Sequence, residues 1–293
     1  GEATPLMNIS LYQIKERLAR GDLPIITGFL GETQHGVTTT LGRGGSDYTA
    51  TLVGAALEAK EIWIWSDVDG LLSADPRIVP EARLISEVSC AEAIEMGQFG
   101  AKSMHPRALE PAAEKGIPVR IRNTFRPEVE GTLIRPSVKQ EGTRSVNLVR
   151  DAALLTIEGA AMVGLPGMAG RVFQALGSAG INIRMISQSV SEAGISLLIS
   201  ERHLEEARAV LESELLRSGS AREIRVEEEV AIVAIVGAGM RGRSGVAADV
   251  FGAVAERGIN IHAIAQGSSE LSISFVVPRS SGPEAVKALH EKF

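Results

Sequence analysis

The sequence predicts an α/β protein whose second half consists of two ferredoxin-like domains. Two observations lead to this prediction. The second half repeats itself at a fixed spacing, and each copy alternates β-branched strands with amphipathic helices. In the first half, strand-like and helical segments also alternate, joined by loops rich in glycine and aspartate.

The repeat aligns without a gap. The stretch that starts at Ile181, INIRMISQSVSEAGISLLI, matches the one that starts at Ile259, INIHAIAQGSSELSISFVV, at an offset of 78 residues. The same offset pairs Gly167 with Gly245 upstream. A duplication of this length predicts two copies of one small domain.

Each copy is predicted to run strand, helix, strand, strand, helix. In the first copy ALLTIEG is a β-branched run, GRVFQALGSAG is an amphipathic helix, and the next two strands flank Glu192 and Ala193. HLEEARAVLESELLRSG supplies a second helix and REIRVEEE a fourth strand. The result is a four-stranded sheet with two helices on one face. We expect two such units to pack side by side, because packing covers their sheet edges.

A glycine motif in the second copy resembles a dinucleotide-binding fingerprint. Gly237, Gly239 and Gly242 spell GxGxxG directly after the strand VAIVAIV. A hairpin follows the next strand, where a dinucleotide-binding unit would continue with a crossover helix, and Gln266 stands where an acidic residue would bind ribose. The sequence therefore argues against a nicotinamide site.

The first half opens with a predicted helix, LYQIKERLARG, and a short buried strand, LPIITGFLG. Gly42–Asp47, GRGGSD, then leads into a helix, YTATLVGAALEA. Its glycines allow a ligand to approach the backbone, the helix N-terminus attracts an anion, and Arg43 can clamp a carboxylate. The pattern fits equally well a plain loop in which Ser46 or Asp47 caps the helix.

A second polar segment follows the predicted strand EIWIW. Asp67, Asp69 and Asp75 can accept hydrogen bonds from a ribose, a base or metal-bound water, and Arg77 can meet a phosphate. Further along, FGAKSMHP holds Lys102 where an ammonium could reach a phosphate. Ordinary Asx turns explain the aspartates equally well.

Composition narrows the functional classes. Thirty-six acidic and thirty basic residues give a net charge of −6, which provides no general attraction to nucleic acid or to an anionic membrane. Cys90 is the only cysteine, and no metal-ligand cluster is apparent in the pattern. No apolar run is long enough for a membrane span, and a cytoplasmic protein is expected.

In combination and order, these segments resemble the aspartate kinase branch of the amino-acid kinase family. The segments are GRGGSDYTA, WSDVDGLLSADPRIVP, AEAIEMGQFGAKSMHPRALEPAAEKGIPVRIRNT and GTLI, and they cover nearly all of residues 25–135. The repeat resembles the paired ACT domains of those enzymes, and VGAGMRG, INIHAIAQGSSE and SISFVV are closest to the threonine-sensitive type, which is often fused to homoserine dehydrogenase. The resemblance divides the chain into part of an α/β/α catalytic domain with a mainly parallel sheet (1–137) and two ACT domains (150–228 and 229–293).

The resemblance implies an enzyme that uses ATP and Mg²⁺ to phosphorylate the side-chain carboxylate of L-aspartate, giving 4-phospho-L-aspartate. It implies that Arg43, with Gly44, Gly45 and Ser46, binds aspartate and that Asp47 organises the reacting groups. The implied ATP-binding residues are Ser66, Asp67, Leu71, Leu72, Asp75, Arg77 and Lys102. No metal-ligating residue is assigned.

One departure from the family pattern concerns catalysis. The family begins with a lysine and glycine-rich loop of the form KFGGTS, and nothing like it precedes Gly28. We therefore expect these 293 residues alone to be inactive. A non-catalytic amino-acid-sensing subunit is the alternative, and a kinase of the same fold acting on glutamate, a nucleotide or carbamate is a further one.

The resemblance also implies an amino-acid effector and a homo-oligomer that forms through the ACT domains. The implied effector-binding residues are Asn182, Ile183, Gln188, Asn260, Ile261 and Gln266. A lysine effector would call for a carboxylate near the INI stretches, where Arg184 and His262 stand. Threonine is therefore favoured over lysine.

Overall fold

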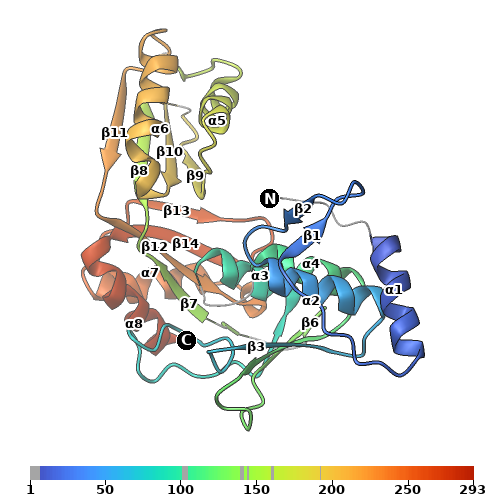
Figure 1. The fold of residues 1–293 in the computed structure, drawn as a ribbon. Helices are drawn as coiled ribbons and strands as arrows, with labels where there is room; N and C mark the ends of the chain where they lie inside the picture. Colours follow the sequence, from blue (N-terminus) through green and yellow to red (C-terminus); the bar gives the residue numbers. More distant parts are fainter. Residues whose placement is uncertain (1–6, 101–104, 139–141, 144, 160–161, 192) are drawn as a thin grey trace. The chain divides into compact units, whose positions relative to one another are not determined.

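The protein is described here as a computed structural model that covers residues 7–100, 105–138, 142–143, 145–159, 162–191 and 193–293 (Figure 1). The chain forms two compact units. The first unit comprises Gly1–Ser145 and Val236–Met240, and the second comprises Val146–Ile235 and Arg241–Phe293.

The first unit is a layered α/β structure. Its strands are β1 (Leu30–Glu32), β2 (Thr38–Thr40), β3 (Ile62–Ser66), β4 (Glu87–Ser89), β5 (Val119–Asn123) and β6 (Thr132–Arg135), and its helices are α1 (Met7–Ala19), α2 (Gly45–Ala56), α3 (Cys90–Gln98) and α4 (Pro106–Glu114). The main sheet has the order β3-β5-β6-β4. Strand β3 is parallel to β5 and β4 to β6, whereas β5 and β6 are antiparallel. A mainly parallel sheet was predicted, and two of its three strand pairings are parallel.

Buried and exposed side chains alternate along β3 and show which face of the sheet the helices cover. Ile62 and Ile64 are buried in a core shared with α2, α3 and α4, which lie together on one side of the sheet in Figure 1. The intervening Trp63 and Trp65 point to the other face and remain half exposed, with their ring centroids 5.9 Å apart. Arg122 of β5 stacks over both rings. Period-two alternation therefore separates the core face from an aromatic face.

The strand predicted at residues 23–31 is largely wrong. Only β1, at the end of this stretch, forms, and it pairs with β2. Leu23 and Ile25 are 89% and 96% exposed and belong to no strand. Apolar residues do not make a strand without a neighbouring strand to complete their backbone hydrogen bonds.

The second unit contains the two copies of the repeat. The first copy holds β8 (Ala153–Glu158), α5 (Met168–Ser178), β9 (Met185–Gln188), β10 (Gly194–Ile199), α6 (Leu204–Leu211), the π-helical turn η3 (Glu212–Leu216) and β11 (Glu223–Glu227). The second holds β12 (Val230–Val236), α7 (Val246–Glu256), β13 (Ala263–Gln266), β14 (Ser272–Pro278) and α8 (Gly282–Lys292). The 3₁₀ turn η4 (Ala238–Met240) follows β12 in the chain but belongs, with Val236, to the first unit. The two predicted four-stranded sheets are confirmed, with orders β11-β8-β10-β9 and β13-β14-β12-β7.

The fourth strand of the second sheet comes from an unexpected place. Strand β7 (Ser145–Val149) precedes the first copy in the chain, yet it pairs with β12 of the second copy. It occupies the place that β11 takes beside β8 in the first copy. The predicted boundary at residue 150 left these residues in a linker, so the sheet extends beyond the predicted domain range.

The two copies pack against each other through equivalent positions. Strand β9 contacts β13, its counterpart in the repeat. Arg279 forms an ion pair of 2.8 Å with Glu201, the residue 78 positions earlier. Contacts between equivalent residues are characteristic of a two-fold arrangement, here made within one chain.

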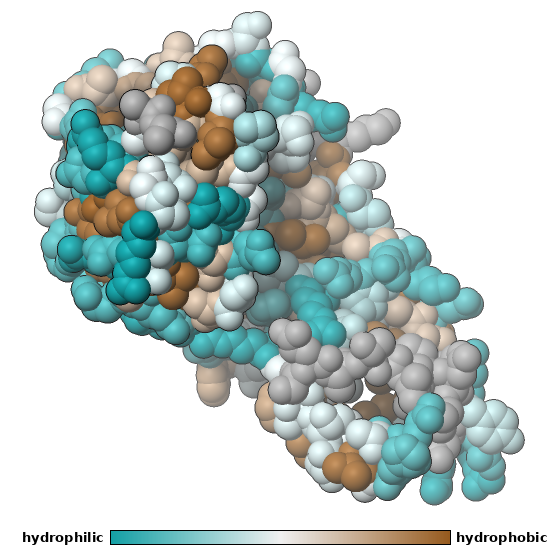
Figure 2. Space-filling view, turned by 90° about the horizontal axis from the view of Figure 1, so that it is seen from above, coloured by the Kyte–Doolittle hydropathy of each residue, from teal (hydrophilic) through white to brown (hydrophobic). Residues whose placement is uncertain are grey.

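The described helices include none that is both long and apolar enough to cross a bilayer. On the face shown in Figure 2, hydrophobic residues lie scattered among hydrophilic ones.

Candidate active site and effector pocket

The glycine-rich loop forms the N-terminus of α2. Gly44 is the N-cap and adopts a left-handed conformation with φ 66°, which favours glycine. A Cβ atom on Gly44 would lie 2.6 Å from Cβ of His105, and one on Gly45 would lie 2.9 Å from Cδ2 of Phe29. Close packing therefore requires glycine at both positions, and the backbone conformation requires it at Gly44 as well.

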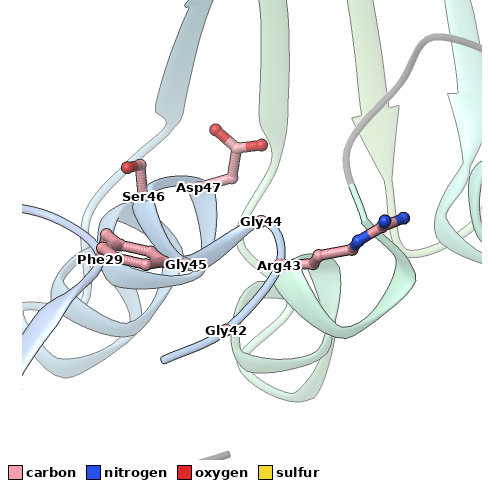
Figure 3. Close-up of a pocket in the computed structure, with 7 residues that line it drawn as sticks. All are labelled: Phe29, Gly42, Arg43, Gly44, Gly45, Ser46 and Asp47. Atoms are coloured by element: carbon pink, nitrogen blue, oxygen red, sulfur yellow. The ribbon is translucent and has the colours of Figure 1, made fainter. Parts of the chain in front are cut away.

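This loop lines an open pocket of about 450 Å³. The lining residues are Phe29, Gly42, Arg43, Gly44, Gly45, Ser46 and Asp47. In Figure 3 the side chains of Ser46 and Asp47 rise on the same side of the helix start, whereas Arg43 extends sideways, away from the helix. The structure thus brings together, around one pocket, the five residues predicted to bind aspartate or to act in catalysis.

The environment of Asp47 is distinctive. Burial raises the pKa of its carboxyl group above the ordinary value. Its place in the first turn of α2 puts it at the positive end of the helix dipole. Thr49 steadies this turn, since its hydroxyl donates to the Gly45 carbonyl at 2.7 Å and accepts the Phe29 N–H at 3.2 Å. Neither Phe29 nor Thr49 was predicted as part of the site.

The predicted nucleotide-binding residues are less closely grouped. Ser66 ends β3, and its hydroxyl donates to Asp67 at 3.3 Å. Asp75 and Arg77 form an ion pair with each other, with an Nη2–Oδ2 distance of 2.6 Å. Arg77 would have to exchange this carboxylate for a phosphate in order to bind one.

The two predicted leucines lie just beyond the strand end. Leu71 is buried in the core, and its N–H donates to the Thr132 hydroxyl at 2.8 Å. Leu72 forms an isolated bridge with Leu84. The predicted Lys102 lies outside the described residues.

A polar cluster at the ends of β3 and β5 was predicted only in part. Asp69 accepts a hydrogen bond from the Asn123 side chain at 2.7 Å and forms an ion pair with Arg126 at 2.6 Å. Asp69 was a candidate acceptor, but Asn123 and Arg126 were not. Asn123 ends β5, and Asp69 and Arg126 follow the ends of β3 and β5. These are the carboxyl ends of two parallel strands, where open α/β sheets bind ligands.

A second pocket, of about 310 Å³, lies at the N-terminus of α5 in the first copy. It is lined by Met162, Gly164, Leu165, Pro166, Gly167, Met168, Ala169, Gln188 and Ile195. Gly167 caps the helix in a left-handed conformation with φ 86°. The amides of a helix start attract a carboxylate, and the Gln188 side chain can donate or accept hydrogen bonds.

Of the residues predicted to bind an effector, Gln188 alone lines this pocket among the described residues. Asn182 is exposed, and Ile183 packs against the core of the first copy. In the second copy Gln266 ends β13, as Gln188 ends β9, and is exposed. Asn260 is exposed, and Ile261 is half-buried in the loop before β13.

Comparison with known proteins follows the same division of the chain. Residues 1–123 match the amino acid kinase family, and residues 155–215 and 233–293 match the ACT domain. A bifunctional aspartokinase/homoserine dehydrogenase from Haemophilus influenzae is 41% identical over 279 residues, covering 94% of this chain and 34% of that protein. An aspartate kinase from Pseudomonas putida is 36% identical over 295 residues, covering 98% of this chain and 70% of that protein.

Solved structures of E. coli aspartokinase III match in two states. Its R-state complex with aspartate and ADP has a TM-score of 0.82 at 35% identity and covers 98% of this chain and 64% of that one. Its T-state complex with lysine and aspartate has a TM-score of 0.82 at 36% identity and covers 99% and 65%. This chain spans about a third of the bifunctional relative. It belongs to the aspartokinases, members of the amino acid kinase family that carry tandem ACT domains.

Proposed function

We propose that the full-length protein transfers the γ-phosphoryl group of ATP to the side-chain carboxylate of L-aspartate, and that an amino acid bound to its ACT domains regulates this reaction. The observation that carries the proposal is the pocket at the start of α2, which combines Arg43, the glycine-rich loop backbone and Asp47. The related E. coli enzyme was solved with aspartate and ADP.

The chemistry asks little of the protein beyond alignment and charge neutralisation. The nucleophile is a carboxylate with an ordinary pKa of about 3.9, so at neutral pH it has no proton to lose. One of its oxygens attacks the γ-phosphorus, while the bond from that phosphorus to the β-phosphate oxygen breaks and ADP leaves. Arg43 is suited to hold a carboxylate of aspartate through two parallel hydrogen bonds.

Asp47 is suited to orient rather than to abstract a proton. Its carboxylate would accept a hydrogen bond from the ammonium group of aspartate, and its raised pKa reflects an environment that this ammonium would relieve. A carboxylate that pairs with the amino group also lets the enzyme discriminate L-aspartate from dicarboxylic acids that lack an amino group. Substrate selection is therefore the proposed role of Asp47.

ATP would enter with its Mg²⁺ as one substrate. The described residues contain no group of three or more His, Cys, Asp and Glu side chains able to hold a metal ion. This fits Mg²⁺, which keeps several waters and binds mainly through substrate phosphates. The predicted residues Ser66 and Asp67 and the Asp69–Asn123 cluster lie at the carboxyl ends of β3 and β5, which favours nucleotide binding there.

The effector is proposed to bind the α5 pocket of the first copy. None of the described residues that line it is acidic. A lysine side chain would bring an ammonium group that needs a carboxylate, so threonine is favoured. Lysine is the second candidate effector, because it is a ligand of the E. coli T-state complex. A cytoplasmic homo-oligomer formed through the ACT domains completes the proposal.

Steady-state kinetics of the full-length enzyme test the catalytic proposal. We expect aspartate-dependent ADP formation, and a rise in KM for aspartate of at least about ten-fold in Arg43→Lys, since lysine loses the bidentate grip. Arg83→Lys, the same exchange at an exposed position outside the pocket, serves as the control. Threonine binding without any phosphoryl transfer would favour the non-catalytic sensor instead.

Asp47→Asn gives a second, pH-dependent test. Because the folded-state pKa of Asp47 is raised, its ionisation favours the unfolded chain, and this penalty appears as pH rises through the unfolded-state pKa towards the folded-state pKa. Asp47→Asn should therefore raise the thermal midpoint at pH 7 while lowering activity toward aspartate. The gain in stability should vanish near about pH 3, where the carboxyl group is mainly protonated in both states. An equal gain at both pH values would contradict the role assigned to burial.

A further inference from the structure

The segment Val236–Met240, called here the glycine segment, belongs to the first unit although the chain on either side of it belongs to the second. Val236 is fully buried in the core that the first unit builds from its main sheet and helices. Met240 is buried as well, and the Gly239 N–H donates to the Gly142 carbonyl at 3.3 Å. The second ACT copy therefore contributes this short segment to the catalytic unit.

One contact of the glycine segment is polar and buried. The Ala238 N–H donates to Oε1 of Glu92 at 2.8 Å, and Glu92 is 1% exposed. The other oxygen, Oε2, accepts the Ser89 N–H at 3.0 Å and the Ser89 hydroxyl at 2.6 Å. The Ser89 side chain in turn accepts the Glu92 N–H, which completes a capping box at the start of α3. A single carboxylate thus begins α3 with one oxygen and holds the glycine segment with the other.

Because the Glu92 carboxylate is buried, its capping of α3 and its hydrogen bond to Ala238 depend on each other. A buried carboxylate is tolerated when donors satisfy its oxygens, and the loss of one donor weakens that compensation. Any displacement of Ala238 therefore bears on the residue that fixes the first turn of α3. Helix α3 ends at Gln98, and the chain continues through Gly100 towards Lys102, the predicted phosphate-binding cation.

We propose that Glu92 is a positioning residue that transmits the state of the second ACT copy to the catalytic unit through its hydrogen bond to Ala238. The proposal rests on the proposed function, since it concerns how an effector changes kinase activity. An effector that shifts the glycine segment weakens or strengthens this bond, and the start of α3 responds. By reciprocity, a change at Glu92 alters the effector's apparent affinity by the same coupling free energy.

Glu92→Gln in the full-length enzyme separates the two tasks. A carboxamide has one acceptor oxygen, and Ser89 offers two donors, so the amide nitrogen of the substituted side chain would face the Ala238 N–H. We expect catalytic turnover without effector to be retained. The threonine or lysine concentration that half-inhibits the enzyme should rise by roughly five-fold or more, the range of typical allosteric couplings.

Two further variants isolate the cause. Ser89→Ala weakens the helix cap but leaves Oε1 of Glu92 facing Ala238, so it should lower thermal stability without changing half-inhibition. Ala238→Pro removes the donor from the opposite side, at the first position of η4, where proline is tolerated. It should reproduce the effect of Glu92→Gln, and the double variant should add nothing further.

Amide hydrogen exchange provides a readout that does not depend on turnover. Threonine or lysine should change the exchange of α3 amides in the wild-type protein and leave them unchanged in Glu92→Gln. Absence of aspartate-dependent turnover would refute the proposed function alone, because exchange still reports the coupling. The coupling is overturned if neither amino acid alters α3 exchange in the wild type. It is equally overturned if Ala238→Pro folds and is inhibited as the wild type is.

Discussion

The two ACT copies share a sequence pattern and a sheet order. They differ after the first strand, where two equivalent methionines pack in different units. In the first copy Met162 packs into the core of its own domain and borders the α5 pocket. In the second copy the equivalent Met240 belongs to the first unit, together with Val236. Met162 therefore serves the pocket of its own copy, whereas Met240 belongs to the first unit.

This difference shows how two copies of a duplicated domain can take on different roles while keeping the same fold. The first copy retains a cavity suited to an amino acid, and the second presents an ordinary backbone N–H to a buried carboxylate. Equivalent residues, Glu201 and Arg279, join the two copies. A ligand on one copy and a contact made by the other can therefore act together.

The largest expected effect comes from truncating the two equivalent methionines. Met162→Ala and Met240→Ala should each lower the free energy of unfolding by about 2–5 kcal/mol, but in different units. Both tryptophans, Trp63 and Trp65, lie in β3 of the first unit, so their fluorescence reports that unit. Met240→Ala should shift the fluorescence-detected urea transition, and Met162→Ala should instead speed hydrogen exchange in β8 and β10.

Methionine-to-leucine exchanges at the same two positions serve as controls, because nearly equal volumes should limit the loss to under about 1.5 kcal/mol. If both alanine variants shifted both probes equally, the two segments would not serve different units.

A smaller effect is expected from the glutamines that end β9 and β13. Gln188→Ala removes a side chain that lines the α5 pocket, and one lost hydrogen bond of about 1 kcal/mol corresponds to roughly a five-fold weaker binding of threonine. Gln266→Ala should change threonine affinity much less. Isothermal calorimetry on the full-length protein measures both, and a larger loss at Gln266 would reverse the assignment of the effector site.

The smallest effect concerns the polar residues that tie the strands of each copy. In the first copy burial acts to raise the pKa of Asp151, but hydrogen bonds from Ser200, Arg184 and the Glu201 N–H outweigh it and lower that pKa. At the position of Arg184 the second copy has His262, which pairs with Glu227.

A lowered pKa means that Asp151 stabilises the fold above its unfolded-state pKa and that this contribution is lost as pH falls through the folded-state pKa. Asp151→Asn should therefore destabilise the protein slightly at pH 7, by less than about 1 kcal/mol because the side chain is half exposed. Near about pH 2 the difference between the variant and the wild type should shrink towards zero. Thermal melts at the two pH values decide the matter, and a loss that persisted in acid would point to packing rather than charge.

Sequence reasoning predicted the two sheets because hydrophobic periodicity recurs at a fixed offset, and that signal is local. It missed β7 because a five-residue strand carries no mark of which sheet it will join. It placed a strand at 23–31 on apolar content alone, where Leu23 and Ile25 lie in solvent.

In the candidate site, too, residues that are adjacent in sequence were predicted and residues that come together from distant positions were missed. The loop from Gly42 to Asp47 was predicted as one group because its residues are adjacent in sequence. Asn123 and Arg126 reach Asp69 from more than fifty positions away, and Glu92 reaches Ala238 across 146 positions. Ser89 and Glu92 have the spacing of a capping box, which was not predicted, and no local pattern marks Ala238 as a partner of Glu92.

The place of β7 makes the first ACT copy an insertion within the second. The second sheet needs β7, which precedes the first copy, and β12, which follows it. During synthesis the first copy can finish folding before β12, the partner of β7, has been made. The pairing of β7 with β12 therefore forms late and joins residues that are far apart in the sequence. A chain cut after residue 228 would leave β7 without its neighbouring strand and expose an edge prone to aggregation. Deletion studies of regulation should therefore remove the two copies together with β7.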